Sequence, residues 1–344
     1  MNPYITDILA QPSALRDLLG SYPKRALEEY YGDLINGKFD RIIVTGMGAS
    51  LNAAYPAVIQ LCSQQVPVQF VNAAELYHFM DKMVGNQSLL WMNSQSGRSA
   101  ELVNLLDRFT THPPASILAF VNDISSPMAA RAEVSIDIHA GSEATVSTKT
   151  YVNMLASNLL AAIQLTGGDV DMVLEDLLTA ADAMEGYLSV WQRRMDELDK
   201  AIDEFDQLFI LGRGSSMSAV WNGCLINKEA AKSSFEGMNS ADFRHGPLEL
   251  VTPGFAAIIF AGSPSTAGLN RNLGLDIISH GGSVLCVDSN PDTALPTLVL
   301  PKVSEYARPL LEILPLQMLT LVMARRKGLQ VGEFRYLGKV TDRE

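Results

Sequence analysis

The chain contains the same strand-and-loop pattern twice. Residues 41–50, Arg-Ile-Ile-Val-Thr-Gly-Met-Gly-Ala-Ser, are echoed 166 residues later by residues 207–216, Gln-Leu-Phe-Ile-Leu-Gly-Arg-Gly-Ser-Ser. A second pair, residues 89–97 and 257–265, repeats at an offset of 168 residues. Two landmarks at nearly one offset indicate a duplicated fold. Each runs from an apolar strand pattern through glycine and serine into a helical pattern, which is typical of an anion-binding cradle at a helix N-terminus.

Composition and charge exclude several classes of protein. A chain of 344 residues can form two domains, and 47% hydrophobic with 19% charged residues is an ordinary globular composition. The net charge of −12 argues against binding to nucleic acid, so an anionic ligand must be held by local backbone N–H groups. We find neither a membrane-length apolar stretch nor a secretory signal, which predicts a cytoplasmic protein that does not bind a membrane.

Cysteine and histidine usage predicts that the protein binds no metal. The cysteines Cys62, Cys224 and Cys286 are odd in number and scattered, which indicates reduced thiols rather than a disulfide or zinc site. The five histidines form no metal-ligand motif. We therefore expect neither a metal nor another cofactor.

Strand and helix patterns alternate in both halves of the chain, which predicts an α/β fold with two parallel sheets covered by helices on both faces. We expect helices at 1–40, a first domain at 41–168, a helical linker at 169–206, a second domain at 207–327 and a tail at 328–344 that is either frayed or folded over a site. The expected strands are Arg41–Thr45, Pro67–Val71, Ser88–Met92, Ser116–Val121 and Val134–Asp137, then Gln207–Leu211, one near Ser233–Phe235, Phe255–Phe260, Ser283–Val287 and Thr297–Leu300.

Several separated motifs resemble the sugar isomerase (SIS) family, and most closely the isomerase half of glucosamine-6-phosphate synthase. Residues 94–99, Ser-Gln-Ser-Gly-Arg-Ser, resemble the phosphate loop SQSGET of that family. The segment from Glu229 to His245 resembles its KE…HGP segment, and Lys339 to Glu344 resembles its C-terminal AKSVTVE. The likeness covers both sheet units and the tail. It implies two tandem SIS domains, each a flavodoxin-like three-layer sandwich around a five-stranded parallel sheet.

The resemblance implies a phosphate site in the first domain. Taken alone, a serine-rich turn is more often a plain strand-to-helix connection with helix caps. In this family, however, the hydroxyls and the amide supply donors to a phosphate, and Gly97 lets the backbone approach its oxygens. Arg98 departs from the acidic residue of the family, and the segment around Ser147 is one residue shorter than its family counterpart. The resemblance assigns substrate and phosphate binding to Gly48, Ser50, Ser94, Gln95, Ser96, Ser99 and Ser147.

The resemblance also implies three catalytic residues. Glu229 would move a proton between C1 and C2 of an open-chain sugar, and His245 would assist ring opening. A mid-helix glutamate and a single histidine at a turn are ordinarily structural, so these roles depend on the family likeness. In the family the histidine comes from the neighbouring subunit, which implies a homodimer with a shared active site. Lys339 corresponds to a lysine that forms an imine with a ketose carbonyl.

Two departures from the family suggest a different reaction at the amine end of the substrate. The family lysine three residues before the base is Ile226 here, and the glutaminase half is not seen. We therefore expect an enzyme acting on a 6-phosphorylated keto- or amino-sugar, such as a fructosamine-6-phosphate deglycase or a glucosamine-6-phosphate deaminase. A synthase-like isomerase or aminotransferase, and a non-catalytic phosphosugar sensor, remain as alternatives. The sequence names neither the sugar nor the amine.

Overall fold

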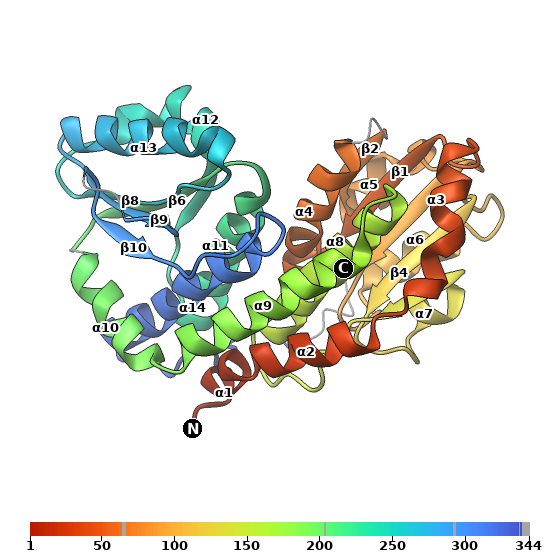
Figure 1. The fold of residues 1–344 in the computed structure, drawn as a ribbon, viewed down its shortest axis with the longest axis horizontal. Helices are drawn as coiled ribbons and strands as arrows, with labels where there is room; N and C mark the ends of the chain where they lie inside the picture. Colours follow the sequence, from red (N-terminus) through yellow and green to blue (C-terminus); the bar gives the residue numbers. More distant parts are fainter. Residues whose placement is uncertain (64–66, 203, 292–293, 337, 339–344) are drawn as a thin grey trace. The chain divides into compact units, whose positions relative to one another are not determined.

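The computed structural model describes residues 1–63, 67–202, 204–291, 294–336 and 338, and it divides into two compact units (Figure 1). The N-terminal unit comprises residues 13–178 together with the described residues from 335 onward. The C-terminal unit comprises residues 1–12 and 179–334. Two of the three boundaries fall inside helices, α2 (Gln11–Ser21) and α9 (Val170–Leu188), and the third lies between residues 334 and 335, after the last helix.

The sheet of the N-terminal unit has five parallel strands in the order β2-β1-β3-β4-β5. Every residue of β3 and β4 is buried, as expected for central strands with helices on both faces. Each strand follows the apolar run that predicted it. The strands are β1 (Arg41–Gly46), β2 (Val68–Asn72), β3 (Ser88–Asn93), β4 (Ser116–Val121) and β5 (Val134–Asp137).

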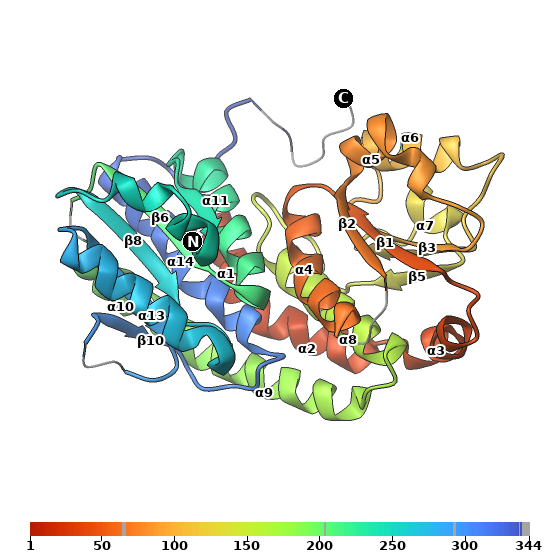
Figure 2. The same ribbon diagram turned by 90° about the horizontal axis from the view of Figure 1, so that it is seen from above.

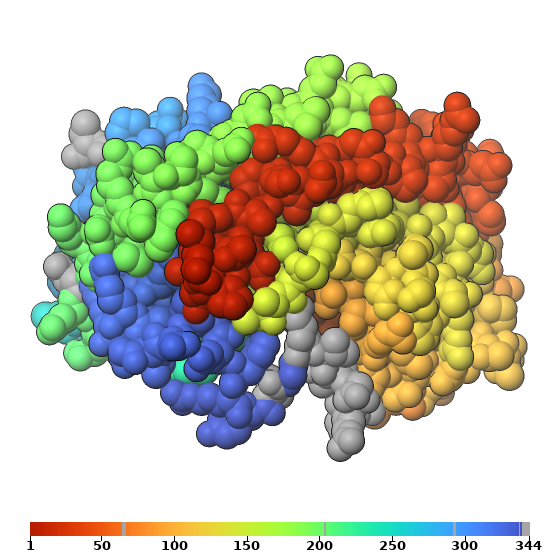
Figure 3. Space-filling model, turned by 90° about the horizontal axis from the view of Figure 1, so that it is seen from below, coloured from red at the N-terminus to blue at the C-terminus, as the bar shows by residue number. Residues whose placement is uncertain are grey.

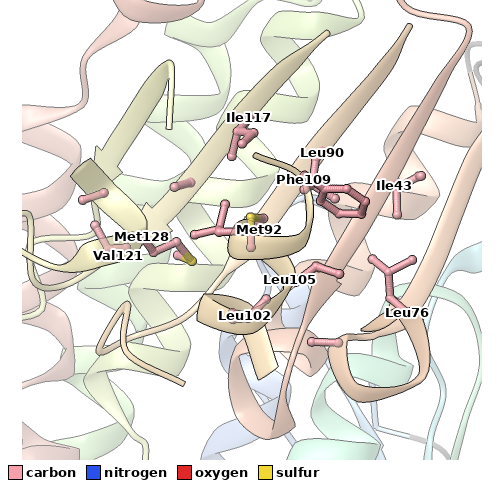
Figure 4. Close-up of a cluster of buried hydrophobic side chains, with 14 residues drawn as sticks. Ile43, Leu76, Leu90, Met92, Leu102, Leu105, Phe109, Ile117, Val121 and Met128 are labelled. Atoms are coloured by element: carbon pink, nitrogen blue, oxygen red, sulfur yellow. The ribbon is translucent and has the colours of Figure 1, made fainter. Parts of the chain in front are cut away.

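Alternate residues of these strands face two helical layers. On one face, Leu90 and Met92 of β3 pack with Leu102 and Leu105 of α6 in a buried apolar cluster (Figure 4). On the other face, the Trp91 indole N–H donates to Asn158 of α8 at 2.6 Å. The helical segments are η1 (Lys24–Leu27), α3 (Glu28–Ile35), α4 (Gly48–Cys62), α5 (Ala73–Phe79), η2 (Asp81–Met83), α6 (Ala100–Arg108), α7 (Pro127–Arg131) and α8 (Lys149–Leu165).

The C-terminal unit repeats this topology. Its parallel order, β10-β9-β8-β6-β7, places β6 and β8 where β1 and β3 lie in the other unit. The duplicated α/β fold predicted from the sequence is therefore confirmed. The strands are β6 (Gln207–Gly212), β7 (Glu236–Asn239), β8 (Phe255–Phe260), β9 (Ser283–Asp288) and β10 (Thr297–Val299).

One expected strand begins later than the sequence predicted. The apolar pattern placed a strand near residues 233–235, whereas β7 begins at Glu236. The cause is the end of helix α11 (Met217–Ala231): Lys232 adopts a left-handed conformation with φ 51°, and the Ser233 N–H still bonds to the Asn227 carbonyl at 3.0 Å. These residues complete the helix cap and cannot join the sheet.

Helices cover the second sheet as they cover the first. Helix α14 runs alongside α11 (Figure 2), just as α8 packs against α4 in the N-terminal unit. The remaining segments of this unit are α1 (Pro3–Leu9), α10 (Trp191–Ala201), η3 (Gly214–Ser216), α12 (Ser240–Arg244), η4 (Pro247–Leu250), α13 (Pro264–Ser279) and α14 (Arg308–Arg326).

The start of the chain packs on the C-terminal unit. The side chains of Gln11 and Gln317 exchange two buried hydrogen bonds of 2.9 and 2.8 Å. The Thr320 hydroxyl also donates to Tyr4 of α1 at 3.3 Å. Figure 3 shows the darkest red residues of the chain directly against the blue residues near its end. Within the described part of the chain, no helix has the length and apolarity needed to cross a membrane.

Candidate functional site

Two loops of the N-terminal unit meet at the carboxyl edge of its sheet. Strands β1 and β3 are neighbours, with Gly46 paired to Asn93 at their ends. Helix α4 follows the first strand almost at once, and α6 follows the second after a short loop. This edge of an open parallel sheet is where ligands bind, because strand ends and helix N-termini meet there.

The first loop carries Gly48 and Ser50. Gly48 opens helix α4 with a φ of 49°, a conformation that favours glycine. Ser50 lies in the first turn of that helix, and its Oγ accepts a hydrogen bond of 3.3 Å from the backbone N–H of Gln95. The structure therefore brings these two sequence-predicted loops together at one place.

The second loop is a tight turn that is held by hydrogen bonds to the hydroxyls of its own serines. The Ser94 Oγ accepts the Gly97 N–H at 3.1 Å and lies 3.1 Å from the Ser99 Oγ. The Ser96 Oγ accepts the Arg98 N–H at 3.2 Å. Ser94 is 3% exposed, while Gln95, Ser96 and Ser99 are partly buried. Hydroxyl groups and N–H groups thus line a short segment just before helix α6.

Only glycine fits at position 97. Its φ is 60°, and a Cβ placed there would lie 2.0 Å from the Ser126 Oγ. The Met128 N–H donates to the Gly97 carbonyl at 3.2 Å, so the turn is also tied to α7. The turn is therefore closely packed at Gly97, while the approach of its backbone to a phosphate stays a prediction.

A third loop brings Ser147 to the start of α8. The Glu143 carboxylate accepts four hydrogen bonds of 2.7–3.1 Å from the backbone and hydroxyls of Thr148 and Thr150. The Ser147 Oγ lies 2.7 Å from the Thr150 hydroxyl. Asn122, just beyond β4, holds the loop by bonding to Gly141 and Ala140, each at 2.8 Å.

The positioning residues Glu143 and Asn122 were not singled out from the sequence. Glu143 lies inside a motif that drew attention to its serine instead, and Asn122 is a single amide after a strand. Its position directly after the strand that became β4, at the same sheet edge as the serines, is the signal that would have identified it. Its loop partners lie almost 20 residues further along the chain, so the contact itself follows only from the folded structure.

Arg98 does not leave a free positive charge at the loops. Its guanidinium donates to the Asp123 carboxylate at 2.9 Å, and both side chains are substantially exposed. Hydrogen bonds from Ser125 and from Arg98 hold the pKa of Asp123 below its ordinary value. Because the arginine is paired, the site offers mainly neutral donors, which suits an anion recognised by geometry rather than by net charge.

The C-terminal unit carries Glu229 and His245. Glu229 lies near the end of α11, partly buried, and Lys232 donates from its Nζ to the carbonyls of Glu229 and Glu333. His245 is exposed at the end of α12, where its N–H donates to the Asp242 carbonyl at 2.9 Å. Lys339 lies outside the described residues. The serine loops and these two side chains thus belong to different units of the chain.

The equivalent edge of the second sheet has different chemistry. Ser216 Oγ, which corresponds to Ser50, donates to the Glu312 carboxylate at 2.9 Å. The Ser263 Oγ, after β8, lies 3.2 Å from the Glu305 carboxylate. Carboxylates at both positions would repel a phosphate, so the two repeats have diverged at the site.

These features define a duplicated α/β protein with hydroxyl- and amide-lined loops at the carboxyl edge of its first sheet. Residues 35–164 match the family model of the SIS domain, so this segment of the N-terminal unit is an SIS domain. It is also 28% identical over 355 residues to a glutamine–fructose-6-phosphate aminotransferase (isomerizing) from Pyrococcus horikoshii, covering 97% of this chain and 56% of that protein. The chain therefore spans little more than half the length of this curated relative.

Solved structures share the fold. The C-terminal domain of glucosamine-fructose-6-phosphate aminotransferase from Francisella tularensis matches with a TM-score of 0.85 and 21% identity, covering 96% of this chain and 98% of that chain. Glucosamine-6-phosphate deaminase from Thermotoga maritima matches with a TM-score of 0.76 and 18% identity, covering 98% of this chain and 99% of the other. At such identities the likeness establishes the fold, and function must be argued from the site.

Proposed function

We propose that the protein is an isomerase-type enzyme of phosphosugars, and that it acts as a deglycase or deaminase on a 6-phosphorylated keto- or amino-sugar. The observation that carries the proposal is the joining of the serine loops through Ser50 and Gln95. Relatives named for fructose 6-phosphate and glucosamine 6-phosphate support the same substrate class.

The phosphate would be held by the serine loops of the N-terminal unit. Ser94 and Ser99 offer hydroxyls 3.1 Å apart, and the first N–H groups of α6 follow directly. A dianion there meets several donors and the positive end of the helix dipole. Ser147 and Gln95 would contact the sugar beyond the phosphate.

Glu229 would act as the base of the proton transfer. In an open-chain fructosamine, it removes a proton from C1, the electron pair forms a C1–C2 double bond, and the C2 carbonyl oxygen takes a proton. Return of the proton to C2 leaves an iminium between C1 and nitrogen, and the N–H proton then passes back to the acid that protonated the C2 oxygen, which gives the imine. Water then adds to C1 and the amine departs, releasing glucose 6-phosphate. The steps are redox-neutral and need only an acid and a base.

His245 and Lys339 would complete the site. A histidine that protonates the ring oxygen opens the sugar, and an amine at position 339 could hold the ketose as an imine. We propose that His245 reaches the sugar of a neighbouring subunit, which makes the homodimer the active form. Exposure of His245 at a helix end is compatible with that role.

The amine end is where this protein would differ from the aminotransferases. Ile226, one helical turn before Glu229, is fully buried and apolar, and so offers no charge to a substrate. When water releases the amine, the reaction does not require a group at this position that delivers ammonia. This favours the release direction over synthesis.

Hydrogen exchange tests the proposed chemistry. The protein is incubated with fructose 6-phosphate in heavy water, and loss of the C1 proton signal is followed by NMR. We expect exchange in wild type and none in Glu229→Gln, whereas Glu236→Gln, an exposed glutamate on β7, keeps it. Tight binding of the sugar without exchange in wild type would instead identify a sensor.

Turnover then identifies the substrate. Phosphorylated fructosamines with different amino acids, and glucosamine 6-phosphate, are screened by mass spectrometry for glucose 6-phosphate or fructose 6-phosphate. Activity on a fructosamine identifies a deglycase, and activity on glucosamine 6-phosphate alone identifies a deaminase. If a verified dimer turns over none of them, the proposed reaction is wrong.

A further inference from the structure

A short segment after the last helix is fastened to the end of α11. We call this segment, residues 328–334, the strap, and it belongs to the C-terminal unit. The Gly332 N–H donates to the Ala230 carbonyl at 3.1 Å. The Asn2 side chain donates to the Val331 carbonyl, also at 3.1 Å. The strap is therefore held at two points through its own backbone.

Lys232 adds a third attachment through its side chain. Its Nζ donates to two carbonyls, that of Glu229 in α11 and that of Glu333 in the strap. Its own carbonyl accepts a hydrogen bond of 2.8 Å from the Lys327 Nζ. One ammonium thus joins the last turn of α11 to the strap. A cation is favourable there, because the last carbonyls of a helix carry the negative end of its dipole.

The backbone at Lys232 is in a conformation that lysine rarely adopts. Its φ is 51°, and His139 is the only other described residue besides glycine with a positive φ. Glycine is usual just after a helix, since a Cβ destabilises the left-handed conformation. A lysine here carries a conformational cost that the backbone cap alone does not explain. Strain of this kind is concentrated at functional sites.

The strained residue lies beside the proposed base. Glu229 is in the last turn of α11, three residues before Lys232, and the lysine ammonium contacts its backbone carbonyl directly. This carbonyl is one of the last four of the helix, which find no partner within the helix itself. The place of Glu229 therefore depends on a side-chain contact as well as on the helix.

We infer that Lys232 is a positioning residue, which fixes Glu229 by clamping the strap to the last turn of α11. The inference rests on the proposed role of Glu229 as the base. Proton transfer between C1 and C2 requires a carboxylate within reach of both carbons, and a small displacement of a reacting group lowers the rate strongly. Lys232 acts through Glu229 and not on the substrate.

Replacement of Lys232 by glycine separates positioning from folding. Glycine keeps the left-handed cap and relieves the strain, so Lys232→Gly should fold with a Tm close to that of wild type. His139→Gly, the same change at the other strained residue, shows how far the Tm moves when a left-handed residue is replaced. The clamp, however, is lost. We expect kcat for hydrogen exchange in fructose 6-phosphate to fall at least about tenfold, with little change in KM.

A conservative variant tests whether the cation itself matters. Lys232→Arg keeps a cation long enough to reach the same carbonyls, and it should retain most of the exchange rate. An active wild type with an equally active Lys232→Gly would overturn the inference and leave the proposed function intact. Absence of exchange in wild type would instead contradict the proposed function.

Crystal structures test the clamp without an activity assay. In crystals of Lys232→Gly, we expect the strap to move away from α11 and the Glu229 carboxylate to leave its wild-type position. A strap and carboxylate that superpose on those of wild type would overturn the inference, whatever the activity of wild type. In solution, the Gly332 N–H should exchange with heavy water faster in Lys232→Gly than in wild type, and equal rates would show that Lys232 holds no strap.

Discussion

The backbone N–H of Gln95 donates a hydrogen bond of 3.3 Å to the hydroxyl of Ser50, joining the loops that follow β1 and β3. These residues lie 45 positions apart in the chain, and the contact arises because the two strands are neighbours in the sheet. It fixes the relative position of the two loops that we propose to hold the phosphate.

Removing the Ser50 hydroxyl should weaken binding of a sugar phosphate. Ser50→Ala loses a donor to the phosphate and frees the second loop, and we expect the Kd for fructose 6-phosphate to rise about tenfold, which corresponds to the ~1.4 kcal/mol of one good hydrogen bond. Calorimetry measures the change. Ser189→Ala, which removes an exposed hydroxyl just after α9 that donates to the Gly186 carbonyl, serves as the control. Unchanged affinity in Ser50→Ala would exclude this serine from the phosphate site.

A side chain at position 97 should both destabilise the N-terminal unit and abolish binding. Gly97→Ala would place a methyl group 2.0 Å from the Ser126 Oγ at a φ of 60°. We expect a loss of about 2–4 kcal/mol in the free energy of unfolding, measured with urea. Gly85→Ala, where nothing lies within 4 Å of the added methyl, should cost far less. Equal stabilities of the two variants would contradict the tight turn.

The fold could be predicted from local patterns of apolar residues in the sequence. Runs such as Ile42 to Val44 and Leu89 to Met92 are apolar without alternation, which is typical of strands buried on both faces. The repeat then fixes the second sheet from the first. The start of β7 was mispredicted because the conformation of Lys232 depends on how α11 ends, which propensity alone does not determine.

The site was less accessible to sequence reasoning than the fold. The serines stand out because they follow strands. Two contacts depend on which strand ends are neighbours in space. They are the ion pair of Arg98 with Asp123 and the hydrogen bond from Asn122 to the Gly141 carbonyl. The burial of Glu312 could not be predicted from the sequence, since a single glutamate in an apolar helix ordinarily faces solvent. Its burial is a property of tertiary packing.

Loss of the Glu143 carboxylate should loosen the start of α8. Glu143→Ala removes the acceptor of four hydrogen bonds, two of them from backbone N–H groups. We expect the free energy of unfolding to fall by about 1–3 kcal/mol, because a buried donor left without a partner is costly. Hydrogen exchange should show faster opening at Thr148 and Thr150. Exchange rates equal to those of wild type would mean that Glu143 does not anchor this loop.

Stability should depend on pH through Glu312. Its pKa is about 7 in the folded chain against an ordinary value of 4.5. Below pH 4.5 both states carry the proton, and between 4.5 and 7 the folded state binds more protons than the unfolded state. Stability from this group therefore falls as the pH rises through that window and does not change further above it.

Comparison of wild type with Glu312→Gln isolates this contribution. Wild type should lose roughly 2–3 kcal/mol more stability than Glu312→Gln between about pH 5 and about pH 8, as the carboxylate becomes charged in a buried place. Urea unfolding at a series of pH values measures the difference. Parallel pH profiles for the two proteins would show that Glu312 titrates normally and that its burial places no strain on the second sheet.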